Sequence, residues 1–504
     1  MSSVPRLLRT VSHLRPHQVY YQVYHRLVKP RFCSFSAPTG QRGKFVVACI
    51  LKPVCLRETT FEFLKLSAPF TSWNDASRGN LWCYNLNYMD WLGQEGMTEA
   101  EGVYWIDKFI SDLPTIEMGL DAAPTAIRCT NWIKFFCCFP PVATPEREDC
   151  LYSQLILLER KLEYHLLANH LLEDAFALYF GASYFCDEAL LDKAEQLLIS
   201  ELKEQILPDG AHFEQSPMYH CVMLDRLLDC CNIKPTAFLK ETASKMLGHL
   251  ESIIWNDKTI PLLNDSAYGI APTPELLFDY ARRLGLKWEA IPMKECGYRR
   301  MVGDGIEAIV DIGEITANYQ PGHTHADLFS YELRMEGRPV VVDTGITTYD
   351  KTPRRQYERS TRAHNTVSVD GKDSFEVWGG FRVGKRARVT IEKDEPLLIE
   401  ATHNGFGHVL QRRSFELQEN GFVVRDSVSG SAKGVSYIHL APGRSALIVG
   451  ENMVDCGDFL IVFSGADSVS LREDSVSTQY NVFEKSTVVE IEFTGEMSYT
   501  ISKK

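Results

Sequence analysis

Apolar residues between Tyr152 and Cys231 recur at spacings of three and four residues, the period of an α-helix with one buried face. The clearest series are Leu155, Leu158, Leu162 and Leu166, followed by Leu190, Leu191, Leu197 and Leu198. Gly181-Ala-Ser and Pro208-Asp-Gly interrupt the pattern, so we expect several antiparallel helices stacked in chain order. Residues 80–130 and 235–295 show the same period more weakly.

The pattern changes after about Arg300, where β-branched and aromatic residues alternate with polar ones and glycine-containing turns recur. The predicted strands are Glu307–Ile312, Leu328–Met335, Pro339–Asp343, Asn365–Val369, Arg386–Glu392, Phe415–Leu417, Phe422–Val428 and Ser436–Leu440. Glu336-Gly337-Arg338 is the predicted turn of a hairpin. Short alternating strands of this kind are typical of an antiparallel β-sandwich.

The two patterns predict a multidomain α + β chain. Its 504 residues exceed what one hydrophobic core usually organises. We expect a domain of stacked helices over residues 1–298, followed by an antiparallel β-sandwich over residues 299–504.

Composition narrows the possible partners. The chain is 45% hydrophobic and 24% charged, as in ordinary soluble proteins, and its formal net charge is −13. This acidic balance argues against nucleic acid and anionic membranes, so an anionic ligand would need a local basic groove. Scattered cysteines indicate reduced thiols, and we see no signal peptide or membrane-spanning run. We therefore expect a cytoplasmic protein, or a periplasmic one if a leader has been removed.

The window from Gly322 to Asn365 is rich in metal-binding residue types. If its first segment is a strand, His323, His325 and Asp327 project from one face, because alternate residues share a side. Imidazole and carboxylate groups are suitable ligands for zinc or a similar divalent ion. The alternative is that these are polar residues in turns.

A second cluster begins at Pro208-Asp-Gly and contains His212, Glu214 and Tyr219. A tyrosine can transfer protons where cations or hydrogen bonds stabilise its phenolate, although such a residue can also simply pack at the surface. His212 and Glu214 could contact a sugar or fix the loop that presents Tyr219. Asn169-His170 lies in a helical stretch, where asparagine is a poor interior residue.

A basic stretch lies between Asp350 and His364. Its cations are Lys351, Arg354, Arg355, Arg359 and Arg362. Guanidinium groups bind carboxylate and sulfate in bidentate geometry, so an anionic ligand would be drawn here unless these charges pair internally. Tyr349 and Tyr357 could line a sugar site.

Together these segments resemble the heparinase II/III-like polysaccharide lyases. The motifs are Asn80–Trp91, Asp209–His220, Gly322–Asp327, Val340–Gly345 and Arg362–Val367, in that order. The resemblance implies an incomplete (α/α) toroid followed by an antiparallel β-sandwich, in agreement with the periodicity, and a site between the two domains. Asn264-Asp265 resembles another family block, which we expect to shape the helical wall of that cleft.

The resemblance also implies roles for single residues. Asn169 and His170 would neutralise the substrate carboxylate, Tyr219 would transfer protons, and His323 would face it. The C5 proton of a uronic acid is too weakly acidic to remove until the adjacent carboxylate is neutralised. A base then takes that proton and an acid protonates the O4 leaving oxygen. Tyr219 could do both in a syn elimination, or His323 could be the base in an anti elimination.

The resemblance further implies one divalent metal ion, usually zinc, that braces the sandwich beside the site. His325, Asp343 and His364 match the metal-binding positions.

Three functional hypotheses follow. The first is a lyase for glycosaminoglycan-like chains such as heparan sulfate, hyaluronan or chondroitin, with alginate and bacterial capsule or O-antigen oligosaccharides as alternative substrates. The second is a glycoside hydrolase, for which Glu214 and Asp265 are the nominated carboxylates. The third is a non-catalytic glycan-binding protein on the same fold.

Overall fold

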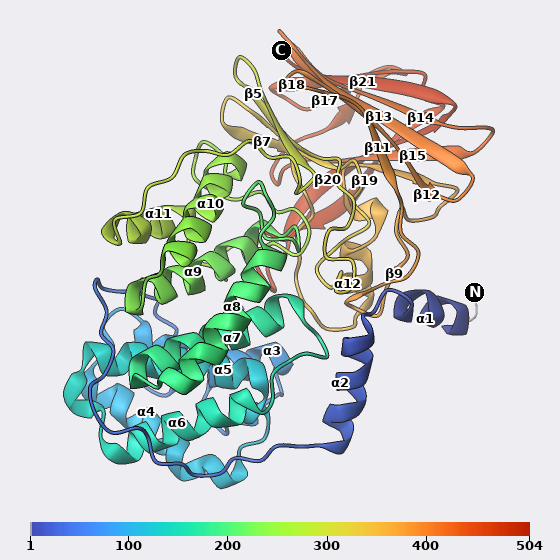
Figure 1. Cartoon of the computed structure of the whole chain (residues 1–504). Coiled ribbons are helices and arrows are strands. Elements are labelled where there is room, and N and C mark those ends of the chain that lie inside the picture. Colours follow the sequence, from blue (N-terminus) through green and yellow to red (C-terminus); the bar gives the residue numbers. More distant parts are fainter. Residues whose placement is uncertain (1–2) are drawn as a thin grey trace.

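The computed structural model describes residues 3–504, and its helical and sheet regions lie side by side (Figure 1). Three helices are buried on nearly every side, namely α5 (Ala122–Cys138), α7 (Ala168–Phe185) and α9 (Pro217–Ile233). A helix that is apolar all round belongs in a core, and α5, α7 and α9 contact one another in chain order. They form the inner layer of the helical domain.

A second set of helices packs outside this layer. The outer helices are α6 (Pro145–Glu159), α8 (Glu188–Gln205) and α10 (Ala237–Ile253), which contact α5, α7 and α9 respectively. Each leaves a larger share of its residues exposed than its inner neighbour does. This arrangement of inner and outer helices confirms the predicted incomplete (α/α) toroid.

The remaining helices and a small sheet complete the N-terminal half. The helices are α1 (Ser3–Val11), α2 (Pro16–Leu27), α3 (Asn80–Tyr88), α4 (Glu99–Asp112) and α11 (Pro274–Arg283), and the strands are β1 (Leu56–Arg57), β2 (Thr60–Phe63) and β3 (Leu66–Pro69). Helix α1 lies against the sandwich, where Arg9 binds Glu376 and Trp378 donates a hydrogen bond to Thr10. No helix in residues 3–504 combines the length and hydrophobicity needed to cross a bilayer.

Two details of the helical prediction were wrong. Gly181 does not end a helix, because α7 continues to Phe185, and a β-carbon at Gly181 would lie 2.4 Å from the Leu155 side chain of α6. The glycine therefore permits close helix packing. The second error concerns residues 160–167, which form a loop, so that Asn169 lies in the first turn of α7 and not in a helix interior.

The C-terminal half is built from antiparallel strands. One sheet has the order β11 (Val389–Glu395), β12 (Leu398–Phe406), β13 (Val409–Gln418), β14 (Gly421–Val428), β21 (Glu496–Lys503), β18 (Phe459–Ser464), β17 (Met453–Asp455) and β16 (Leu447–Ile448). A second has the order β19 (Ser468–Val476), β20 (Glu484–Thr494), β15 (Lys433–His439) and β8 (Val367–Val369), and a third the order β4 (Tyr298–Val302), β5 (Ile306–Asp311), β6 (Tyr331–Met335) and β7 (Arg338–Val341). Side chains from all three sheets share one apolar core, which confirms the predicted sandwich.

The predicted hairpin turn is present between β6 and β7. Met335 pairs with Arg338, so the loop itself has two residues, Glu336 and Gly337. Both have positive φ, as a tight antiparallel turn of this class requires.

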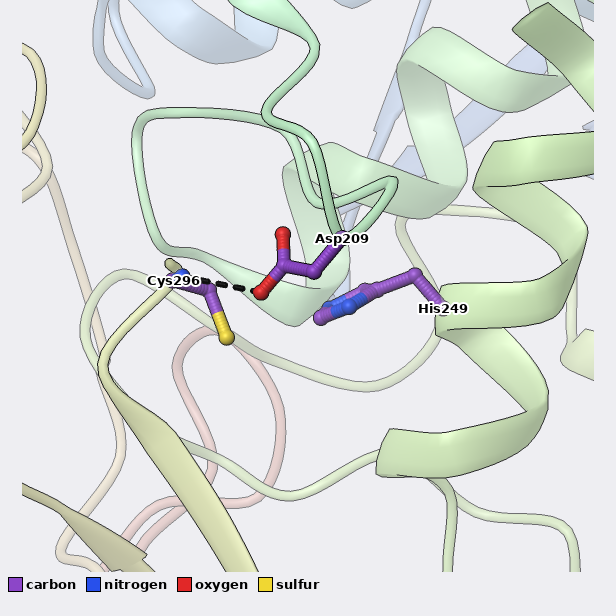
Figure 2. Close-up of side chains that lie close together, drawn as sticks. All are labelled: Asp209, His249 and Cys296. Atoms are coloured by element: carbon purple, nitrogen blue, oxygen red, sulfur yellow. Dashed lines mark hydrogen bonds between the residues drawn. The ribbon is translucent and has the colours of Figure 1, made fainter. Parts of the chain in front are cut away.

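Helix α11 ends at Arg283 and strand β4 begins at Tyr298. The connection between them is tied to the helical domain by Asp209, whose Oδ2 accepts hydrogen bonds from the backbone amides of Lys294 and Cys296. Figure 2 shows the bond from Cys296. Short strands β9 (Val377–Trp378) and β10 (Arg382–Val383), with helix α12 (Pro353–Glu358), lie in the loops of the sandwich that face the toroid.

Candidate active site

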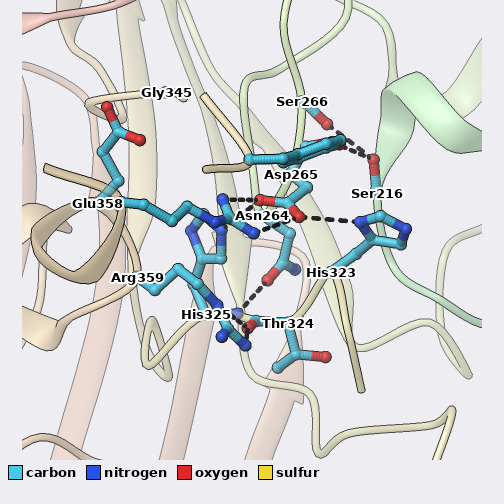
Figure 3. Close-up of polar contacts among 12 residues, drawn as sticks. Ser216, Asn264, Asp265, Ser266, His323, Thr324, His325, Gly345, Glu358 and Arg359 are labelled. Carbon is cyan, nitrogen blue, oxygen red and sulfur yellow. Dashed lines mark hydrogen bonds and ion pairs between the residues drawn. The ribbon is translucent and has the colours of Figure 1, made fainter. Parts of the chain in front are cut away.

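Asp265 lies at the centre of a buried polar network at the junction of the two domains (Figure 3). Its Oδ2 accepts a hydrogen bond from His323 Nδ1 at 2.8 Å, and its Oδ1 accepts one from His325 Nε2 at 2.7 Å. Arg355 binds the same carboxylate in bidentate geometry, at 2.5 and 2.7 Å. Burial alone would raise the pKa of Asp265, but Arg355 and the two histidines hold this pKa well below its usual range.

The bond to Asp265 fixes the orientation of His323. Because Nδ1 donates to a carboxylate, the neutral ring carries its lone pair on Nε2. Nε2 lies 3.6 Å from Glu214 Oε2. The arrangement is that of a histidine held by a buried carboxylate through one nitrogen, with the other available for proton transfer.

Tyr219 lies directly against His323. The two ring centroids are 3.9 Å apart at an interplanar angle of 30°. Tyr219 belongs to the first turn of α9, where Ser216 accepts a hydrogen bond from its backbone amide and donates one to the carbonyl of Asp265. The cap of α9 and the histidine network are therefore one connected unit.

The hydroxyl of Tyr219 accepts a hydrogen bond from Tyr349 at 3.2 Å. Burial raises the pKa of Tyr219, and the nearby carboxylates of Asp265 and Glu214 add to this rise. Tyr219 is thus a protonated phenol at neutral pH, which suits a proton donor.

Glu214 connects Asn169 to the histidine. Its Oε1 accepts the backbone amide of Asn169 at 2.9 Å, while its buried Oε2 has no hydrogen-bond partner. The next residue, His170, is partly exposed and binds Glu163 at 3.0 Å. Burial would lower the pKa of His170, but Glu163 outweighs it and raises this pKa, which favours a positive charge.

Aromatic side chains surround the pair. Tyr349 lies with its ring centroid 5.9 Å from that of His323, and Phe381 and Tyr480 contact Tyr349. Phe381 is 36% exposed, so the aromatic wall reaches the surface. The structure thus places His323 against Tyr219, as expected, and adds Tyr349 to this pair.

Two family descriptions match this sequence. "Heparinase II/III N-terminus" matches residues 151–271, and "Heparinase II/III-like, C-terminal" matches residues 286–502. These matches include every residue of the network described above. The chain belongs to the heparinase II/III-like family.

Individual family members are distant in sequence. A heparin-sulfate lyase of Bacteroides stercoris is 22% identical over 349 residues, which are 59% of this chain and 50% of that protein. The chain thus spans about half the length of the curated relatives it matches.

Solved structures of the family have the same fold. A heparinase III superposes with a TM-score of 0.64 at 17% identity, covering 86% of this chain and 80% of its own. A heparan sulfate lyase from Pedobacter heparinus gives a TM-score of 0.56 at 17% identity, covering 97% of this chain and 88% of its own. The likeness extends through both domains.

Three residues that were predicted to bind substrate instead make contacts within the protein. Arg359 is buried and donates to the carbonyl of Thr324, so it supports the histidine loop from behind. Tyr357 binds Asp474 of β19 through its hydroxyl, so it braces the sandwich. His212 is buried against Gln205, and burial lowers its pKa to about 4, so it is neutral and faced away from solvent.

The predicted basic groove is also largely absent from the described surface. The guanidinium group of Arg355 is paired with Asp265, and that of Arg354 binds Glu358 at 2.7 Å. Lys351 and Arg362 remain exposed. Arg354 and Arg355 pair with carboxylates of the protein because they lie on α12, which packs into the domain junction.

The segment predicted as a His-x-His-x-Asp strand is a loop. Residues 313–330 form no strand, and the backbone of this loop is held by Asn264, which accepts the amide of His325, and by Arg359, whose carbonyl accepts the amide of Ala326. His323 and His325 nevertheless converge, because both bind Asp265.

Two buried histidines each have a ring nitrogen that is chemically able to bind a metal ion. His325 Nδ1 and His364 Nε2 are fully buried and have no hydrogen-bond partner, and the two ring centroids are 5.2 Å apart. Asp343 Oδ2 accepts a hydrogen bond from His364 Nδ1 at 2.7 Å, and its Oδ1 accepts the Gly345 amide. Carboxylates often orient metal-binding histidines in this way. His325 Nδ1 and His364 Nε2 are therefore candidate ligands for a divalent ion, whereas both oxygens of Asp343 already accept hydrogen bonds.

Sequence reasoning underestimated two residues of the site. Asp265 was expected to shape the wall of the cleft, or to serve as a carboxylate of a hydrolase, and Arg355 was one of several cations in a basic stretch. Neither has a local pattern that reveals their mutual ion pair, because they come from different domains. The motif Asn264-Asp265 was the available signal.

Proposed function

We propose that this heparinase II/III-like protein is a polysaccharide lyase that cleaves 4-linked uronic-acid glycans by β-elimination. The observation that carries the proposal is the contact of the Tyr219 phenol with His323, whose Nδ1 is held by Asp265. A protonated phenol beside an oriented imidazole provides an acid and a base within one site. The names of the matched relatives, heparin-sulfate lyases, support the same reaction class.

The reaction begins with neutralisation of the substrate carboxylate. The side-chain amide of Asn169 and the imidazole of His170 lie on the first turn of α7, at the positive end of the helix dipole. Hydrogen bonds and positive charge at this carboxylate stabilise the enolate-like anion that forms when the C5 proton leaves.

The proton transfers follow from the states of His323 and Tyr219. Nε2 of His323 takes the proton from C5, and the electron pair forms the C4–C5 double bond. The C4–O4 bond breaks, and the Tyr219 hydroxyl gives its proton to the leaving O4. The two groups regain their starting states through solvent. A syn elimination, with Tyr219 as both base and acid, is the alternative assignment.

The substrate in this proposal is an anionic, glycosaminoglycan-like chain, with alginate or bacterial capsule and O-antigen oligosaccharides as alternatives. The exposed cation Lys351, together with His170, would meet its charges, and Tyr349 and Phe381 would pack against sugar faces.

We further propose that His325 and His364 bind one divalent ion, with zinc as the expected metal and Asp343 as the third metal-site residue. The two unpartnered buried nitrogens support this assignment. When bound, the ion would brace the loop that carries His323, and it takes no part in the proton transfers proposed above.

The hydrolase alternative requires a pair of available carboxylates. Asp265 is fully buried and held by Arg355, His323 and His325, so it can neither contact a sugar nor give up a proton. This observation favours the lyase over the hydrolase.

The proposal is tested by supplying purified, metal-loaded protein with heparan sulfate, hyaluronan, chondroitin and alginate, and following the ultraviolet absorbance of an unsaturated uronate. We expect this absorbance to rise with at least one polymer or its oligosaccharides. Saturated products would support the hydrolase instead, and tight binding without products would support a binding protein.

A further inference from the structure

A second cluster of metal-binding side chains lies apart from the histidine network. Asp209, His249 and Cys296 face one another from three segments (Figure 2). One potential ligand atom from each lies within 4.8 Å of the others, and all three residues are at most 3% exposed. The cluster joins the turn before α9, helix α10 and the connection that leads into β4.

The hydrogen bonds within the cluster leave atoms of Asp209 and His249 free to bind a metal ion. Asp209 uses Oδ2 for the amides of Lys294 and Cys296, while its Oδ1 accepts only a long bond of 3.3 Å from the Ala211 amide. His249 Nδ1 is buried without a hydrogen-bond partner. A buried imidazole nitrogen without a partner is unfavourable unless another group, such as a metal ion, binds it.

A catalytic thiol does not explain this arrangement. The Cys296 side chain is fully buried, and burial raises its pKa, whereas nucleophilic cysteines are accessible and have a lowered pKa. Hydrogen bonding within the protein alone also leaves His249 Nδ1 unsatisfied.

We propose that Asp209, His249 and Cys296 bind one zinc-class divalent ion, at a site separate from His325 and His364. Carboxylate, imidazole and thiolate are all ligands of such ions, and three protein ligands leave a fourth position for water. On binding, the thiol loses its proton to solvent and the sulfur forms a bond to the metal.

An ion could reach this position from the surface. A cavity of about 720 Å³ lies beside the cluster and is lined in part by Asp209, Lys294 and Arg299. It opens between the helical domain and Asp394 of the sandwich, which pairs with Arg299 at 2.8 Å.

The proposed ion would fasten the catalytic segment in place. Asp209 lies just before Glu214 and Tyr219 in the sequence. Cys296 lies just before β4, the first strand of the C-terminal half. Gly210 packs so closely on α10 that a β-carbon there would lie 2.2 Å from the Lys245 carbonyl. A bound ion would thus connect the segment that carries Tyr219 to α10 and to the connection that leads into β4. This role does not depend on which sugar is cleaved.

Cobalt substitution tests the proposal in the full-length protein. A Co²⁺ ion bound by a thiolate gives a sulfur-to-cobalt charge-transfer absorption, which nitrogen and oxygen ligands alone do not give. We expect this absorption in the wild-type protein and in His325→Ala. It should disappear in Cys296→Ser and remain in Cys456→Ser, a matched change at a buried cysteine of the sandwich.

The wild-type spectrum keeps the test decisive even if Cys296→Ser does not fold. Absence of the charge-transfer band in the cobalt-loaded wild type overturns the proposal, as does a band that persists in folded Cys296→Ser. His249→Gln keeps the thiol but removes one ligand, so we expect a weakened or shifted band and one fewer tightly bound metal ion per chain. An unchanged band and metal content in this variant would also contradict the site.

Discussion

The ring of Tyr219 lies on the ring of His323, with 3.9 Å between their centroids, although the tyrosine lies in the first turn of a helix of the toroid and the histidine lies on a loop of the sandwich. The proposed acid and base therefore come from different domains. Activity should depend on the docking of these domains as much as on the two side chains.

Removal of the Tyr219 hydroxyl should abolish most of the elimination reaction. Tyr219→Phe keeps the ring contact with His323 but removes the proton proposed to reach O4, so we expect a loss of roughly 10²–10⁴-fold in kcat. Tyr357→Phe is the matched control, because Tyr357 binds Asp474 outside the site. Steady-state rates of unsaturated product measure both variants, and a fully active Tyr219→Phe would refute the assignment.

Replacement of Asp265 should damage both stability and activity. Asp265→Asn leaves the buried Arg355 without its carboxylate and frees His323, so we expect a destabilisation of about 3–5 kcal/mol and loss of turnover. Asp426→Asn breaks a comparable buried pair with Arg413 within the sandwich.

Denaturant unfolding and product formation separate the two effects. Both variants should lose stability by a similar amount, whereas the folded fraction of Asp426→Asn should retain normal turnover. Equal loss of turnover in both would show that Asp265 acts through stability alone.

Glu214→Gln distinguishes the lyase from the hydrolase. The amide keeps an acceptor for Asn169 but removes the negative charge 3.6 Å from His323 Nε2. If the protein is a lyase, we expect kcat of this variant to change by only roughly tenfold, which corresponds to about 1.4 kcal/mol in the activation free energy. Saturated products from the wild type, with an inactive Glu214→Gln and an active Tyr219→Phe, would support hydrolysis.

Loss of His325 should remove metal and stability together. His325→Ala deletes one of the two ring nitrogens proposed to bind the ion, so we expect one fewer zinc ion per chain and a lower Tm. His403→Asn alters a buried histidine outside both proposed sites and should leave the metal content unchanged. Elemental analysis and thermal unfolding give the two readouts, and a wild-type protein without bound metal would count against the assignment.

His403 should make the protein less stable in acid. Burial lowers the pKa of His403 to about 4 from an ordinary value of 6.5. Between these values the unfolded chain binds more protons than the folded chain, so the free energy of unfolding rises with pH. The contribution of His403 is fully present above pH 6.5 and is lost as the pH falls toward 4, by up to about 3 kcal/mol.

Denaturant unfolding of wild type and His403→Asn across this pH range measures that contribution. The variant should show a shallower dependence of unfolding free energy on pH. Parallel curves for the two proteins would indicate that His403 titrates alike in the folded and unfolded states.

The sequence by itself determined the fold class. Helical and strand periods are local properties, and they separated a toroid from a sandwich and located the turn at Glu336 and Gly337. Motif order indicated the family and, with it, Tyr219, His323 and Asn169. Local pattern failed at Gly181, where contact with Leu155 of another helix explains a glycine inside α7.

Only the tertiary structure decided how the site is held together. Asp265 and Arg355 are far apart in the chain, so no spacing rule predicts their ion pair. Arg355 of α12 and Arg359, which follows this helix, are both buried and therefore do not face a substrate. The cluster of Asp209, His249 and Cys296 likewise exists only because three segments converge at the domain junction. Periodicity reports which face of an element is buried, whereas electrostatic partners are chosen by proximity in the folded chain.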